Sequence, residues 1–389
     1  MNKERVEKYI SVWLKNINKE GLAELENDIK MPLKTFMIEI LNNLYEKYRD
    51  EISHIPVNLD RYEDYIIAPR MKMYSLENFL LNRLLRNVTS IIYRDESHSF
   101  MPESHYSPDF GEVLIDKNRI QTQIPDIRQR KKIIAHEFLH GMKTQFFTGD
   151  FLEADTYYQT KEELKEIFNY EINDFERKNS EVNSAYKHCG LFYSSKYFKQ
   201  NYGIQINIDA TNLDEILNED DAISCTKDDY KVIAELAENR YVILSNPESS
   251  NTYITNYSFI IENLVNKKVL FTGLYLEPAT FYKEFNVLYT PIFQKHFNSN
   301  LSAIEILTKQ LDKIKRAPKN IDEHVKLLNT LYDCLNKKYM MNEYGEQKRI
   351  NDIKQITGRG ILEIVNEHLH PLDSLDYAKK YNDNQKKLK

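Results

Sequence analysis

Two histidines stand four residues apart in the segment Ile133-Ile134-Ala135-His136-Glu137-Phe138-Leu139-His140-Gly141-Met142. The apolar residues of this segment recur at helical spacing, so we expect it to form one helix. On a helix, residues i and i+4 lie on the same face, so the imidazoles of His136 and His140 can both reach one metal ion. Glu137 lies about 100° around the helix from His136, where a carboxylate contacts a water on the metal without binding the metal. The segment therefore predicts a zinc site with a catalytic carboxylate beside it.

A plainer interpretation of the same helix stays open. Its apolar residues make the helix largely buried, so His136 and His140 could be two core histidines that are satisfied by other hydrogen bonds. Burying two imidazoles is costly unless they find partners, and one shared metal ion is the simplest partner for both. This argument favours the metal site over the plainer interpretation.

The composition of the 389-residue chain is that of an ordinary globular protein, with 41% hydrophobic and 29% charged residues. A net charge of −6 gives no basic footprint, so we expect no nucleic-acid partner. No segment approaches the roughly 18 consecutive apolar residues of a membrane span, so no membrane association is expected. The three cysteines are widely spaced and form no C-x-x-C pair. Together with an N-terminal segment that does not resemble a secretory signal, this predicts a cytoplasmic protein.

The periodicity of apolar residues predicts an α+β fold that is predominantly helical. We expect four regions: an N-terminal helical region (1–87), a catalytic core (88–265), a C-terminal helical region (266–378) and a disordered polar tail (379–389). Within the C-terminal region the same periodicity predicts helices at 281–297, 301–314 and 321–335.

The catalytic core is expected to combine a small sheet with the histidine helix. Two short apolar runs predict strands at 90–94 and 111–116, beside that helix. The helix itself is expected to start near Pro125-Asp126 and to end at about Phe147. Residues 201–226 are expected to form a loop.

A catalytic zinc takes three protein ligands, so one more residue must complete the set. We expect it to be Glu235, on a later helix whose neighbouring residues are mostly apolar, because a carboxylate there is expensive to bury unless it is paired or bound to metal. Glu153 is the rival, since it follows His140 closely in the chain, and Asp155 is a further alternative. The adjacent pair His188-Cys189, expected on a helix, is interpreted as structural.

The motif H-E-x-x-H with a distant glutamate resembles the gluzincin branch of zinc metallopeptidases. The loop Ser104-His105-Tyr106-Ser107 and the apolar run from Gly111 to Ile115 are also similar to the segment that leads into the active-site helix of that branch. The third ligand there lies in a helix of the E-x-x-x-D or E-G-x-T-E type. Glu235-Leu236-Ala237-Glu238-Asn239 matches this pattern in part, with Asn239 where an acid is expected. The resemblance spans roughly residues 88–265.

The resemblance implies a zincin-like core and a zinc-dependent peptidase that acts on a peptide or protein substrate. It implies Zn²⁺ on His136, His140 and Glu235, with Glu137 as the general base that takes a proton from the attacking water. A tyrosine that follows Glu235, Tyr253 or Tyr257, could donate a hydrogen bond to the transition state. Two other functions remain open: a catalytically degenerate zincin whose helical surface binds a protein, and a zinc hydrolase of a non-peptide amide.

Overall fold

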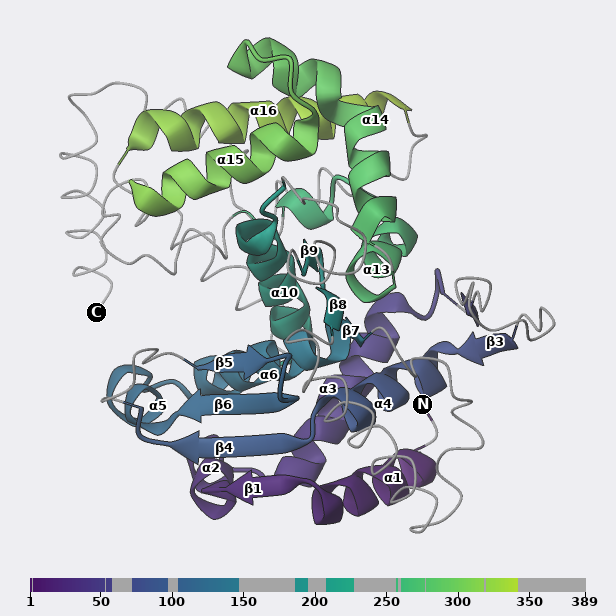
Figure 1. Ribbon diagram of the computed structural model, residues 1–389, viewed down its shortest axis with the longest axis vertical. Helices are drawn as coiled ribbons and strands as arrows, with labels where there is room; N and C mark the ends of the chain where they lie inside the picture. Colours follow the sequence, from purple (N-terminus) through teal and green to yellow (C-terminus); the bar gives the residue numbers. More distant parts are fainter. Residues whose placement is uncertain are drawn as a thin grey trace, which may run out of the picture. The chain divides into compact units, whose positions relative to one another are not determined.

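The computed structural model describes residues 1, 3–52, 54–57, 72–96, 104–146, 186–194, 208–226, 257, 260–276, 278–317 and 320–341. In this part of the chain the fold is α+β and mostly helical, which confirms the expected class (Figure 1). The chain forms two compact units, and both are discontinuous in sequence. The first consists of Met1–Ile206, Asp221–Lys227 and Leu274–Pro278, and the second of Asn207–Asp220, Asp228–Gly273 and Ala279–Lys389.

A four-stranded mixed sheet lies in the first unit. Its strands, in spatial order, are β1 (Asn18–Glu20), β4 (Ser90–Arg94), β6 (Glu112–Asp116) and β5 (His105–Ser107). The first three are mutually parallel, whereas β5 runs antiparallel to β6 at the edge. The middle strands β4 and β6 are almost entirely buried, as is usual for parallel strands that are covered on both faces. Both strands expected from the sequence are therefore present, with the second starting at Glu112.

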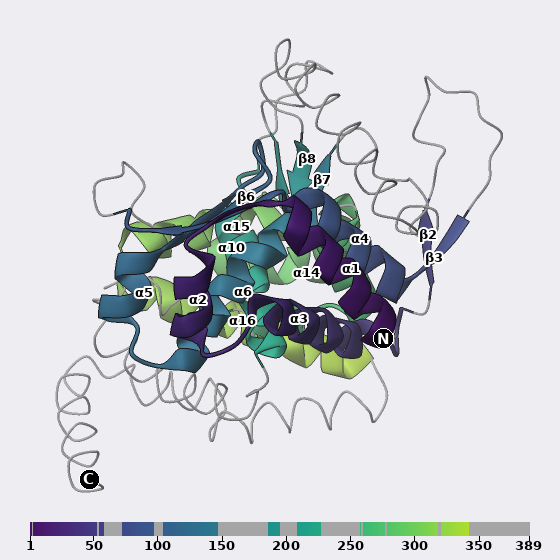
Figure 2. The same ribbon diagram turned by 90° about the horizontal axis from the view of Figure 1, so that it is seen from below.

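Helices accompany this sheet in the first unit, and most of them bury several apolar residues. They are α1 (Lys3–Asn16), α2 (Leu22–Ile29), α3 (Leu33–Tyr48), α4 (Leu76–Asn87), α5 (Lys117–Gln123) and α6 (Ile127–Lys143). The histidine helix α6 packs against α2 and α4 and against strands β5 and β6 (Figure 2). Asp126 caps its N-terminus by accepting a hydrogen bond from the backbone N–H of Arg128.

The helix α6 ends earlier than the sequence suggests. We expected it to continue to about Phe147, but Thr144 adopts an extended backbone conformation and begins strand β7 (Thr144–Phe146). This strand pairs with β8 (Tyr186–Cys189), which pairs with β9 (Phe192–Tyr193). The expectation that His188-Cys189 lies on a helix is therefore wrong, because strand pairing takes up this segment. A separate hairpin joins β2 (His54–Val57) to β3 (Lys72–Ser75).

In the described part of the second unit, the regular elements are helices. Alongside α14 (Pro278–Phe297) they include α15 (Ala303–Arg316) and α16 (Ile321–Met341), close to the bounds expected from the periodicity. Three of these helices cross a boundary between the units. The helix α10 (Thr211–Cys225) enters the first unit at Asp221, α13 (Lys267–Tyr275) enters it at Leu274, and α14 leaves it after its first residue, Pro278. The loop expected at 201–226 is thus wrong for its second half. Among the described helices, none combines the length and the apolar character that crossing a membrane requires.

Candidate metal site

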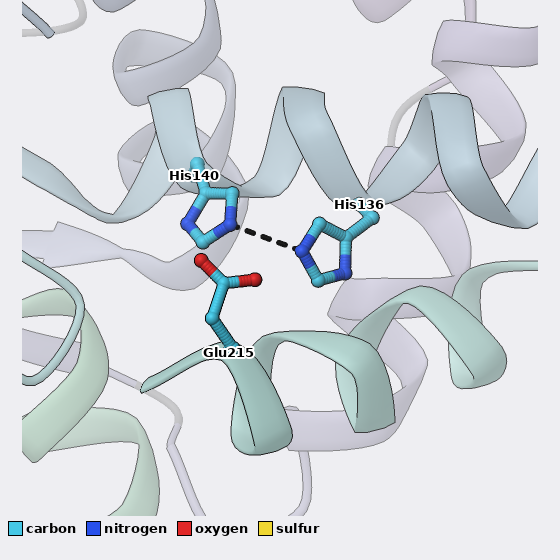
Figure 3. Close-up of side chains that lie close together, drawn as sticks. All are labelled: His136, His140 and Glu215. Atoms are coloured by element: carbon cyan, nitrogen blue, oxygen red, sulfur yellow. Dashed lines mark hydrogen bonds between the residues drawn. The ribbon is translucent and has the colours of Figure 1, made fainter. Parts of the chain in front are cut away.

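His136 and His140 lie together on one face of α6, as their spacing predicts. Their Nε2 atoms are 3.0 Å apart and their ring centroids 4.7 Å apart, with the ring planes at 77° (Figure 3). Both imidazoles and the side chain of Glu137 are at most 9% exposed. Two imidazole nitrogens that lie this close together on one buried side of α6 form a donor pair of the kind that zinc prefers.

The C-terminal end of α6 is held by side chains of α4. The Asn87 amide donates to the carbonyl oxygens of Gly141 (2.8 Å) and Thr144 (2.6 Å), and the Arg83 guanidinium donates to the same Thr144 oxygen (2.6 Å). The Thr144 hydroxyl donates to the carbonyl oxygen of His140 at 2.8 Å. Carbonyls in the last turn of a helix have no partner within the helix, so these bonds replace the missing ones. They fix the turn that carries His140.

Gly141 brings α6 into close contact with strand β5. A Cβ atom at this position would lie 2.8 Å from Cγ2 of Val88 and 3.2 Å from Cε2 of Tyr106. The Tyr106 hydroxyl donates to the backbone oxygen of Asn87 at 2.9 Å. Burial, reinforced by the nearby Cys189, raises the pKa of Tyr106 well above its usual value, so it remains a neutral donor. The residue after the second histidine therefore has to be small.

A buried carboxylate, Asp221 of α10, joins four elements of the first unit. It accepts contacts from Lys143 of α6 (2.7 Å), Lys47 of α3 (2.8 Å), the Tyr48 hydroxyl (2.8 Å) and the Tyr275 hydroxyl of α13 (3.0 Å). The side chains of Lys143 and Asp221 are completely buried. Burial alone would raise the pKa of Asp221, but the charges of Lys143 and Lys47 outweigh burial and hold that pKa well below its usual range. We call these five residues the Asp221 cluster.

Acidic side chains of α10 complete two groups of metal-binding character among the described residues. Each group offers ligand atoms within 4.8 Å of one another: His136, His140 and Glu215 form one, and His140, Cys189 and Asp214 form the other. Figure 3 shows the carboxylate of Glu215 directed toward the two rings. The Cys189 sulfur lies 3.8 Å from Nδ1 of His140 and donates to the carbonyl oxygen of His140.

Several residues singled out from the sequence lie outside the described residues. These are Glu235, its rivals Glu153 and Asp155, and Tyr253. Tyr257 is described, and it is a core residue of the second unit: its ring stacks on His324, and its hydroxyl is 2.8 Å from Nδ1 of that histidine.

Glu215 was not among the expected ligands, because its segment was interpreted as a loop. The available signal is Glu215-Ile216-Leu217-Asn218-Glu219, in which two acids are separated by three residues. This is the E-x-x-x-acid spacing of the gluzincin resemblance, which Glu235 matches only in part.

Comparisons with models of known families, with curated proteins and with solved structures find no match to this chain.

Proposed function

We propose that the chain is a zinc-dependent peptidase with a zincin-like core, in which His136, His140 and Glu215 hold the zinc. The observation that carries the proposal is the convergence of two buried imidazoles on one side of α6, with a carboxylate directed toward them. Two histidines and a glutamate form one of the ligand sets of catalytic zinc, and a set of three leaves a coordination position for the reaction.

The choice of Glu215 over Glu235 rests on spacing and on the helix that carries it. Glu215 is followed four residues later by Glu219, which is the spacing of third-ligand helices in the gluzincin resemblance. It lies on α10, whose last turn is fixed in the first unit by Asp221.

The sheet beside α6 supports a peptide as the substrate. Strand β5 is an edge strand of the described sheet, and it packs against α6. Edge strands carry backbone N–H and C=O groups that an extended peptide can pair with, and such pairing is independent of the peptide's side chains. Phe110, in the turn between β5 and β6, is 71% exposed and offers an apolar contact next to this edge.

Glu137 carries the proton transfer in the proposed reaction. Zinc, when bound, lowers the pKa of a water and polarises the scissile carbonyl. The Glu137 carboxylate takes the proton that the attacking water loses as its oxygen bonds to the carbonyl carbon. The same carboxyl then gives this proton to the amine that leaves when the C–N bond breaks. Its burial keeps bulk water from competing for the proton.

The test of the activity is digestion of a peptide library by zinc-loaded protein, followed by mass spectrometry. We expect wild type to cleave peptide bonds and Glu137→Gln to bind zinc equally well while cleaving about 10²–10⁴-fold more slowly, because an amide cannot accept the proton. Glu46→Gln, at an exposed carboxylate of α3, serves as the control and should cleave like wild type. Zinc binding without any cleavage would favour the degenerate zincin or the non-peptide amidase instead.

The test of the third ligand compares three glutamates. We expect Glu215→Gln to lose most of its zinc at a chelator concentration that leaves wild type loaded, because two protein ligands hold zinc poorly. Glu235→Gln and Glu153→Gln should keep the wild-type zinc content, measured by mass spectrometry of the metal in dialysed protein. If Glu235→Gln or Glu153→Gln loses its zinc and Glu215→Gln keeps it, the third ligand is that other glutamate. The proposal of a zinc peptidase would remain.

A further inference from the structure

The Asp221 cluster fixes the end of the histidine helix inside the first unit. Lys143 is the last residue of α6, and its ammonium contacts one carboxylate oxygen of Asp221, while the Lys47 ammonium of α3 contacts the other. The ring of Tyr275 lies 5.5 Å from the Lys143 ammonium, so its hydroxyl faces the carboxylate and its ring faces the cation. Every one of these contacts lies inside the first unit.

Lys143 shares a helix face with both histidines. It follows His136 by seven residues and His140 by three, and residues at i, i+4 and i+7 lie in one row on a helix. A movement of Lys143 toward or away from Asp221 therefore shifts this face of α6, and with it the imidazoles of His136 and His140. Because Asp221 also contacts Lys47 of α3 and Tyr275 of α13 within the first unit, Lys143 holds this end of α6 against the rest of that unit.

Stability alone does not account for a buried ion pair at this position. Removing two charges from water costs about as much as their attraction returns, so an apolar pair of similar volume is often equally stable or more stable. What an ion pair adds is a defined geometry, because its attraction is strongest in one arrangement of donor and acceptor. Metal affinity depends on such geometry, since ligands must reach the ion at fixed distances.

We propose that Lys143 and Asp221 are positioning residues, whose ion pair fixes the C-terminal turn of α6, and thereby the direction of the two imidazoles and the zinc affinity of the site. This inference rests on the proposed function. It assigns no contact with zinc or substrate to either residue. Loss of Lys143 removes the ion pair of the histidine helix, whereas loss of Lys47 leaves that pair in place.

Lys143→Met and Lys47→Met form a matched pair of variants, because each removes one ammonium from the same carboxylate at nearly the same distance. We expect Lys143→Met to bind zinc about 10–100-fold more weakly than wild type in competition with a chromophoric chelator, the size of effect typical of residues that orient ligands. We expect Lys47→Met to retain the wild-type zinc affinity. The visible absorption of Co²⁺-loaded protein, which reports ligand geometry, should change in Lys143→Met alone.

Each outcome decides between the proposals. Wild type that binds no zinc would overturn the proposed function, and this inference with it. Wild type that binds zinc, with both methionine variants equal to it or equally weakened, would overturn this inference alone. If Lys143→Met does not fold, Asp221→Asn takes its place, since it keeps the size of the side chain and removes its charge. Wild-type zinc affinity and an unchanged Co²⁺ spectrum in Asp221→Asn would then refute the positioning role.

Discussion

Gly141 is a residue at which a single methyl group conflicts with the packing of α6. The distances that a Cβ atom would have there, 2.8 Å to Val88 and 3.2 Å to Tyr106, are shorter than carbon atoms normally tolerate, and both neighbours are buried. We expect Gly141→Ala to lower the free energy of unfolding by about 1–3 kcal/mol through overpacking, although alanine is the better helix former.

Urea unfolding followed by circular dichroism measures this change. Gln129→Ala, at an exposed position of the same helix, is the control and should stay within about 0.5 kcal/mol of wild type. A Gly141→Ala variant at least as stable as wild type would show that α6 can shift away from β5 without cost, and that glycine is not required there.

Individual site residues differ in how far the sequence reveals them. His136, Glu137 and His140 are predictable because their relation is local: one turn of helix places the two imidazoles together. Glu215 is not, because it lies 75 residues after His140 and approaches the histidines only in the folded chain. A separation of that length in the sequence does not predict the distance between two residues in the fold, since the intervening chain can take many paths.

At the scale of elements, the ends of helices were harder to predict than their existence. The apolar period identifies α6 and the helices α14 to α16, because one buried face repeats every three or four residues. The end of α6 is set instead by the pairing of Thr144 with β8 and by the bonds from Asn87, neither of which leaves a local signal. The helix α10 escaped prediction because its many acidic residues resemble a solvated loop, whereas most of them are buried.

The Asp221 cluster joins elements through charge, so its contribution to stability depends on pH. The pKa of an unfolded aspartate is about 3.9, and that of folded Asp221 is lower. The ion pairs therefore contribute fully above about pH 3.9, and their contribution is lost as the pH falls toward the folded-state pKa. At pH 7 we expect Asp221→Asn to lower the free energy of unfolding by about 3–5 kcal/mol, because it leaves buried lysines without their counter-charge.

Urea unfolding of wild type and Asp221→Asn between about pH 7 and pH 3 checks this dependence. The difference between the two proteins should be constant down to about pH 4 and should shrink below that value. Asp50→Asn, at an exposed carboxylate, should track wild type throughout. If the difference in free energy of unfolding stays constant over the whole range, the lower stability of Asp221→Asn does not come from the loss of the charge on Asp221.

At the scale of the whole molecule, the division into two units could not be inferred from the order of predicted elements. The regions expected from the sequence, 1–87, 88–265 and 266–378, are contiguous, and their boundaries stay predictions. The units, by contrast, exchange segments at Asp221 and at Leu274. Both exchanges occur inside helices, α10 and α13, whose apolar residues continue across the boundary, so no linker composition marks either position.

The passage of α10 into the first unit has a consequence for synthesis on the ribosome. Asp221 follows Lys143 by 78 residues, and at about 5–20 residues per second this stretch takes about 4–16 s to synthesise. During that interval the emerging histidine helix has neither the carboxylate that neutralises its last residue nor the helix that carries Glu215. The nascent first unit can complete its burial only after Tyr275 has been added. If His136, His140 and Glu215 hold the zinc, the complete ligand set therefore exists only several seconds after the histidine helix has been translated.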